Sequence, residues 1–138
     1  MPYIFKQKIN LQDLVPTENR IVKILIYEPE EYLAGLYRLY MHPYNFHIKH
    51  CLEVTELLGN LAVFEPELLI YNADTGKNFL LNKTLFKNYP SLKIITTAYN
   101  ISHEQVRKLM DHGVSSHINR RFSRPADVAT LVATVLNH

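Results

Sequence analysis

Two short polar side chains, Asn72 and Asp74, stand directly after the apolar run 66–71. The run opens with a proline and an acid, and a short apolar run with polar and turn residues at its ends is typical of a strand buried on both faces. In an open parallel sheet, ligands and reacting groups lie just beyond the carboxyl ends of the strands. Whether this chain has chemistry there depends largely on what the amide of Asn72 can and cannot do.

Alternating apolar and periodic segments predict the elements that hold these side chains. The predicted strands cover 21–27, 46–51, 67–72, 92–98 and 114–119, and the predicted helices cover 32–40, 52–61, 79–89, 102–110 and 125–136. Five strand–helix units in a row imply a parallel sheet with helices on both faces. We therefore predict an α/β fold, a flavodoxin-like doubly wound five-stranded sheet of strand order 2-1-3-4-5.

Local signals support several of these boundaries. The strand 46–51 alternates between apolar and polar residues, which indicates an edge strand with one wetter face. Ser102 and Gln105 have the spacing of a capping box at the start of a helix. Gly113 stands where a glycine ends that helix. Residues 1–20 read as an N-terminal arm or linker, either packed on the domain edge or contacting a partner, and residues 21–138 read as one domain.

Composition narrows the class of protein. The chain has 138 residues, 47% hydrophobic and 20% charged, which is an ordinary globular balance for one domain. The net charge of +2 is too weak to imply nucleic acid, and the single cysteine, Cys51, favours a reducing compartment. No apolar run has the length of a membrane span, and no signal-peptide segment is recognisable. We therefore expect a soluble cytoplasmic protein that does not insert into membranes.

The seven histidines show no metal-ligand spacing, and no base is spaced to activate Cys51 as a thiol nucleophile. We therefore expect no metal and no cofactor, and Cys51 reads as a small strand residue.

Four stretches in the right order resemble the receiver domain of response regulators, the phosphoacceptor module of two-component signalling. They cover residues 23–29, 66–72, 94–99 and 113–122, and the resemblance extends over about residues 21–137. It implies the fold predicted above and a site at the ends of these strands. The chain departs from the family at nearly every site position. The departures are Glu28 and Pro29 for the acid pair, Asn72 for the phosphoacceptor aspartate, Arg120 for the lysine and Arg121 for the proline after it. Only Thr97 matches the family's site.

The departures matter chemically. Phosphoryl transfer to a receiver needs a carboxylate nucleophile, and a primary amide such as that of Asn72 forms no stable acyl phosphate. The reaction also needs Mg²⁺, which carboxylates hold, and only Glu28 remains at a matching position. Arg120 keeps the positive charge of the lysine as a planar fork. We expect very weak Mg²⁺ binding and an ion pair between Glu28 and Arg120 beside neutral Asn72.

Asp74 is the alternative phosphoacceptor. It lies two residues beyond Asn72, at a position that in the family lines the pocket without accepting phosphate. A register slip would be needed to bring it forward, and Pro66 with the apolar run fixes the alignment. We interpret Asp74 as a loop carboxylate that makes a turn or cap, with an active, relocated site as the competing hypothesis.

Other positions concern switching and partners. Thr97 matches the switch hydroxyl of the family and His117 falls at its switch aromatic, so we expect this pair to hold one fixed arrangement. His117 is also a candidate pH sensor. A modest basic zone is formed by Arg120, Arg121 and Arg124, near Arg107 and Lys108. It is either a solvated face or a partner surface on the segments 102–110, 114–119 and 125–136, through which family members dimerise or dock.

The sequence predicts a degenerate pseudo-receiver that is not an enzyme and acts as a protein-interaction module in signal transduction. Its partner would be a histidine kinase, another regulator or a second copy of itself, with a homodimer as one form. Two alternatives stay open: a receiver phosphorylated at Asp74, and a module that binds a small ligand or nucleic acid, of which nucleic acid is the weaker variant because no recognition motif is present.

Overall fold

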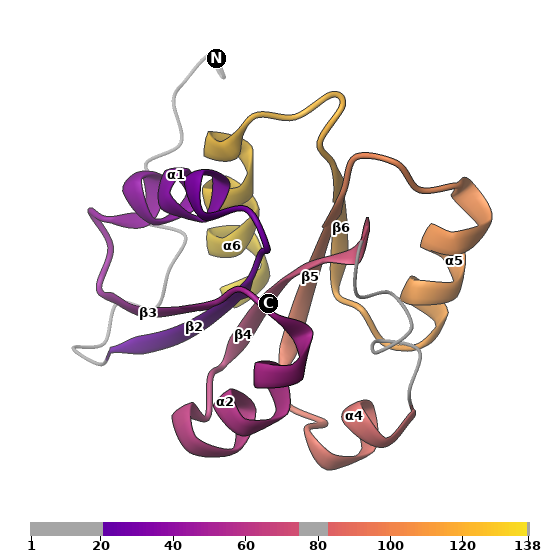
Figure 1. The fold of residues 1–138 in the computed structure, drawn as a ribbon, viewed down its shortest axis with the longest axis horizontal. Helices are drawn as coiled ribbons and strands as arrows, with labels where there is room; N and C mark the ends of the chain where they lie inside the picture. The colour runs from indigo at the N-terminus through magenta and orange to yellow at the C-terminus, as the bar shows by residue number, and fades with distance from the viewer. Residues whose placement is uncertain (1–20, 75–82, 138) are drawn as a thin grey trace.

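A computed structural model describes residues 21–74 and 83–137 as a parallel sheet between two layers of helices (Figure 1). The strands are β2 (Val22–Tyr27), β3 (Phe46–Cys51), β4 (Leu68–Asn72), β5 (Lys93–Ala98) and β6 (Ser116–Asn119). They lie in the order β3-β2-β4-β5-β6, and each neighbouring pair is parallel. Taken in chain order this is the arrangement 2-1-3-4-5, so the predicted flavodoxin-like fold is confirmed.

Five α-helices and one 3₁₀ turn connect and cover the described strands. They are α1 (Glu31–Met41), a 3₁₀ turn (Val54–Glu56), α2 (Leu57–Phe64), α4 (Lys83–Asn88), α5 (His103–Asp111) and α6 (Pro125–Leu136). The helices α1 and α6 lie side by side on one face of the sheet, and α2, α4 and α5 cover the other.

Alternating residues of the central strands build the two cores. In β2, Ile24 and Ile26 point to the α1–α6 side, and Leu25 and Tyr27 point to the α2–α5 side. All five residues of β4 are buried, as expected of a central strand covered on both faces. Each large apolar side chain buried in this way contributes about 1.5–3 kcal/mol, so two cores position the strand ends firmly.

The predicted boundaries hold with one clear exception. The edge strand β3 alternates in exposure, Ser102 and Gln105 form the predicted capping box, and Gly113 has a φ of 115° just after α5. The helix predicted over 52–61 was wrong, because the chain makes a 3₁₀ turn first and then an α-helix that ends at Phe64. It ends there because Glu65 adopts a left-handed conformation, with φ 53°.

Some predictions fall on residues outside the described ranges. These are the N-terminal arm over 1–20, the loop at 75–78 and the first residues of the helix predicted over 79–89. Within 21–74 and 83–137, no helix is long and apolar enough to cross a membrane.

Candidate functional site

The carboxyl ends of four neighbouring strands bring the predicted site residues to one edge of the sheet. Glu28 follows β2, Asn72 ends β4 in register with Thr97 of β5, and Arg120 follows β6. Pro29 lies in the β2–α1 connection. The backbone of Glu28 is fixed from the edge strand, because its N–H donates to Cys51 O and its carbonyl accepts from His50 Nε2 at 2.8 Å.

The buried carboxylate of Glu28 is held by an amide. Asn72 Nδ2 donates to both carboxylate oxygens, at 3.0 and 3.1 Å, and the Glu30 N–H donates to Oε2 at 3.0 Å. Glu28 is 2% exposed and Asn72 is 5% exposed. Since a buried carboxylate needs donors around it, an amide at position 72 supplies what a second carboxylate could not.

Asp74 is held differently, by a cation and by backbone. Its Oδ2 accepts from Tyr99 N at 2.9 Å, its Oδ1 accepts from Asn100 N at 3.0 Å, and Arg120 Nη2 forms an ion pair with it. Asn72 Oδ1 accepts the Asp74 N–H at 2.8 Å, which closes the turn between the two residues. Asp74 thus ties the end of β4 to the loop after β5 and to the end of β6.

The expected ion pair between Glu28 and Arg120 was therefore wrong. Within the described residues, Arg120 pairs with Asp74, while the acceptors of Glu28 are used by Asn72 and by the Glu30 backbone. The reason is position: Asp74 stands two residues beyond the end of the strand, where the Arg120 side chain reaches it. The expectation that Asp74 makes a turn or cap agrees with its two backbone donors.

Mg²⁺, which the receiver resemblance implies, does not fit these side chains. Within 21–74 and 83–137, no group of three histidine, cysteine, aspartate or glutamate side chains could hold a metal ion. The two carboxylates at this edge are already bound by an amide and by a guanidinium. A hard cation that prefers several oxygen ligands would have to displace both.

Beneath this edge lies a layer of buried hydroxyls. Thr97 is fully buried and Tyr37 of α1 is 1% exposed. Burial raises the pKa of Tyr37 to about 12, with the nearby Glu28 charge adding to the effect. The neighbouring Thr97 hydroxyl opposes this rise in the Tyr37 pKa. Neither hydroxyl oxygen has a partner at hydrogen-bond geometry among the described residues. Tyr37 was missed by the sequence reasoning as a site residue, because helical spacing predicted only that it faces the core.

His117 pairs with Thr96, not with Thr97. Thr96 and His117 are register partners in β5 and β6, and His117 Nδ1 lies 2.7 Å from Thr96 Oγ1. Thr97 is the register partner of Ile118 and points to the other face of the sheet. Burial lowers the pKa of His117, and the Asp74 charge opposes this shift weakly. The fixed arrangement expected of Thr97 and His117 stays a prediction, and the contact of His117 with Thr96 follows from strand alternation.

The arginines of the predicted basic zone do different things. Arg121 Nε donates to Tyr99 O at 2.8 Å, and its guanidinium lies 4.7 Å from the centre of the Tyr99 ring. Arg124 is exposed, 3.8 Å from Asp127, and Arg107 is exposed on α5. Arg121 therefore braces the same loop that Asp74 holds, and the other two stand on the surface.

Cys51 offers no reactive thiol. It is 4% exposed, and burial raises its pKa to about 11. A thiol kept protonated inside the core is a poor nucleophile, which agrees with its interpretation as a small strand residue.

Comparison with known proteins places this fold among receiver domains. No protein-family model matches the sequence, and no curated protein matches it by sequence. Among solved structures, an orphan response regulator of H. pylori superimposes with a TM-score of 0.76 at 11% identity, over 83% of this chain and 96% of that one. A CheY-like receiver domain from Methanospirillum hungatei gives 0.75 at 16% identity, over 86% and 95%. An atypical orphan response regulator described as having a phosphorylation-independent regulatory mechanism gives 0.73 at 11% identity, over 83% and 95%.

Proposed function

We propose that this chain is a pseudo-receiver: a signalling module that works without phosphorylation, is not an enzyme, and acts by binding another protein. The observation that carries the proposal is the pair formed by Glu28 and Asn72. An amide donating to both oxygens of a buried carboxylate stabilises the strand ends without metal or phosphate. Asn72 stands at the position that the receiver resemblance assigns to the phosphoacceptor, and an amide cannot form an acyl phosphate.

The contacts of Asp74 argue against a relocated phosphoacceptor. Both of its oxygens accept backbone N–H groups, and one of them is also paired with Arg120. Nucleophilic attack by either oxygen would break at least one of these contacts, and no described metal cluster stands beside it to neutralise an incoming phosphate.

The solved structures add weaker support. The H. pylori protein is called an orphan response regulator, and the second orphan regulator is described as regulated independently of phosphorylation. The same mode of action here agrees with the contacts of Glu28 and Asp74, which are already bound by Asn72 and Arg120. A cytoplasmic place of action is part of the proposal and rests on the receiver resemblance.

The partner surface of the proposal is the face formed by α5, β6 and α6. It carries His117, Arg107, Arg121 and Arg124, and Phe122 beside them is 84% exposed. A protein partner would be a kinase, another regulator or a second copy, and basic side chains around an exposed aromatic ring suit a partner with acidic and apolar groups.

The first experiment tests the loss of phosphorylation. The full chain is incubated with acetyl phosphate and Mg²⁺ and its intact mass is measured. The proposal predicts no gain of a phosphoryl group. A gain that disappears in Asp74→Ala would replace it with the relocated-site alternative.

The second experiment tests the interaction face. Proteins captured from the source cell by the wild-type chain are compared with those captured by an Arg121→Glu, Arg124→Glu variant. Loss of a specific protein from the variant is expected. An Arg38→Glu variant, which reverses the charge of one exposed arginine on α1, serves as the charge-reversal control on another surface. Equal loss with this control would contradict the proposed face.

A further inference from the structure

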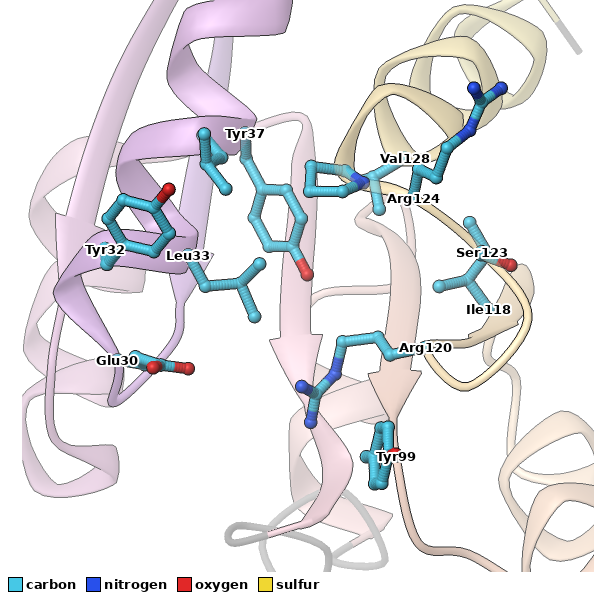
Figure 2. Close-up of a pocket in the computed structure, with 12 residues that line it drawn as sticks. Glu30, Tyr32, Leu33, Tyr37, Tyr99, Ile118, Arg120, Ser123, Arg124 and Val128 are labelled. Carbon is cyan, nitrogen blue, oxygen red and sulfur yellow. The ribbon is translucent and has the colours of Figure 1, made fainter.

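A pocket of about 340 Å³ opens between α1 and α6, next to the edge that carries Arg120 (Figure 2). Its size lies at the lower end of the range for small-molecule sites, about 300–1,000 Å³. The residues that line it come from the start and body of α1, from the loop after β5, from β6 and α6, and from the segment that joins them. Of the residues of the predicted phosphoacceptor site, Arg120 alone lines it.

The walls of the pocket are mostly apolar and aromatic. Two tyrosines stand at its mouth, Tyr32 at 75% exposed and Tyr99 at 51% exposed. The inner wall is formed by Leu33, Leu36, Ile118 and Val128. Such walls suit the body of a small organic compound, and a few polar groups are then enough to orient it.

The charges at one side of the pocket favour an anion. Arg120 and Arg124 both line it, although Figure 2 shows the Arg124 side chain turned outward, away from Arg120. The helix α6 begins at the pocket with Pro125, so the positive end of its dipole faces it. Arg124 is held only loosely by Asp127, at 3.8 Å, and its side chain is 83% exposed. Glu30 is the acidic residue on the opposite rim and suits a hydroxyl or amine on the same compound.

The floor of the pocket carries unmet hydrogen-bonding capacity. Tyr37 lines the pocket and is 1% exposed, and its hydroxyl lies near that of Thr97 without a partner at hydrogen-bond geometry among the described residues. The Nε of Arg120 is also buried without one, and Figure 2 shows the Tyr37 hydroxyl directed toward the Arg120 side chain. Because buried polar groups in native proteins are nearly always paired, two such groups facing each other under a pocket mark a place for a polar group from a ligand.

We propose that this pocket binds a small organic anion, a carboxylate or phosphate attached to an apolar or aromatic body. The anion lies beside Arg120 within reach of the Tyr37 hydroxyl after a small side-chain shift, the exposed Arg124 side chain turns in toward it from the rim, and the body packs on Leu33 and Val128. The ligand competes with Asp74 for Arg120, and through Asp74 it acts on Tyr99 and Asn100. Binding itself is independent of the proposed function, whereas its use as an effector that replaces phosphorylation rests on it.

Calorimetric titration of the full chain tests binding with three probes. The two anionic probes are 3-phenylpropionate and phenyl phosphate, which separate the carboxylate from the phosphate source, and the neutral probe is 3-phenylpropanol. The proposal predicts saturable binding of at least one anion and none of the alcohol. Equal binding of the alcohol, or no binding of either anion at millimolar concentration, would overturn it.

Variants locate the site and test the competition. Arg124→Gln is expected to weaken binding about tenfold, while Arg38→Gln, an exposed arginine elsewhere on α1, leaves it unchanged. Asp74→Asn frees Arg120, so it should tighten binding several-fold, because two groups that compete for one cation are coupled reciprocally. Unchanged affinity in both Arg124→Gln and Asp74→Asn would place the ligand elsewhere.

Tyr37→Phe separates a binding role from a structural one. It removes an unpaired buried hydroxyl, so the midpoint of thermal unfolding should stay the same or rise, while affinity for the anion falls. A fall in stability without a change in affinity would contradict the role given to the hydroxyl. These outcomes do not depend on acetyl phosphate or on a protein partner, so the inference and the proposed function can fail separately.

Discussion

Two carboxylates, Glu28 after β2 and Asp74 after β4, stand at the same edge of the sheet, and the protein stabilises them in different ways. Glu28 is 2% exposed and is held by the Asn72 amide and the Glu30 backbone, with no cation paired to it among the described residues. The Asp74 side chain is 20% exposed and is held by Arg120 and two backbone N–H groups. The more deeply buried carboxylate, Glu28, accepts hydrogen bonds from neutral donors only, whereas the more exposed one, Asp74, is also paired with a positively charged guanidinium.

The difference shows where the fold tolerates change. The ring of contacts around Glu28 depends on one residue type at position 72, since only a side chain with two N–H donors reaches both carboxylate oxygens there. The contacts of Asp74 are spread over three donors on two segments, so the loss of one leaves the others. Substitutions at the first site should therefore have larger effects than substitutions at the second.

The largest effect is expected for Asn72→Asp. Two carboxylates would then face each other at about 3 Å without a donor between them, which should cost about 2–4 kcal/mol of unfolding free energy at neutral pH. The variant raises the pKa of the pair, so its stability is retained at acidic pH, is lost as pH rises, and is partly restored by Mg²⁺. Urea unfolding at several pH values, with and without Mg²⁺, measures this.

The double variant Glu28→Gln, Asn72→Asp is the matched control. It exchanges the amide and the carboxylate and restores one donor group beside one acceptor group, so most of the lost stability should return. If the double variant is as unstable as Asn72→Asp alone, the pairing of Glu28 with Asn72 is not the cause of the effect.

The next largest effect on stability is expected at alkaline pH and comes from ionisation of Tyr37. Its pKa is raised to about 12 from 10.0, chiefly by burial. A raised folded pKa stabilises the protein below the unfolded value, and this contribution is lost as pH rises from 10 toward 12, by about 3 kcal/mol. Tyr37→Phe should therefore unfold at higher pH than the wild type in an alkaline titration followed by circular dichroism. An identical alkaline midpoint would show that another group, such as Tyr71, controls the transition.

Arg120→Ala tests the shallower carboxylate. Asp74 keeps its two backbone donors, so the expected loss of unfolding free energy is about 1–2 kcal/mol. The amide resonances of Tyr99 and Asn100 should shift, because Asp74 holds this loop. A loss as large as that of Asn72→Asp would remove the distinction between the two carboxylates.

The smallest effect is expected at His117. Burial lowers its pKa below 6.5, so it favours the folded state above that pH and this contribution is lost as pH falls through the lowered value. The unfolding free energies of the wild type and His117→Gln are compared at acidic and neutral pH. The change between the two pH values should be smaller in the variant, by less than about 1 kcal/mol. A steeper dependence in the variant would mean that His117 is charged in the folded state.

The sequence predicted the fold better than it predicted the site. Apolar runs such as Leu68–Tyr71 and the Ser102–Gln105 capping box are local signals, and each fixed an element where the structure has it. The end of α2 was missed because a left-handed Glu65 is not marked by glycine. The gathering of Glu28, Asn72, Thr97 and Arg120 followed from the parallel order of the strands.

The partners within the site were less predictable. Whether Arg120 reaches Glu28 or Asp74 depends on the backbone path just after β4, which cannot be predicted from the residue types. The predicted Glu28–Arg120 ion pair was wrong for that reason. Thr96 was overlooked although alternation along β5 places it, and not Thr97, beside His117. Helical spacing correctly predicted that Tyr37 is buried. It could not predict which groups surround the Tyr37 hydroxyl.

A titration of the wild-type chain with Mg²⁺, followed by amide chemical shifts, tests most directly whether the Asn72 amide has replaced the metal. The resonances of Glu28, Asn72 and Asp74 should show no saturable change at millimolar Mg²⁺, whereas those of Asn72→Asp should. Saturable shifts at these three residues in the wild type would contradict a strand-end site closed without metal.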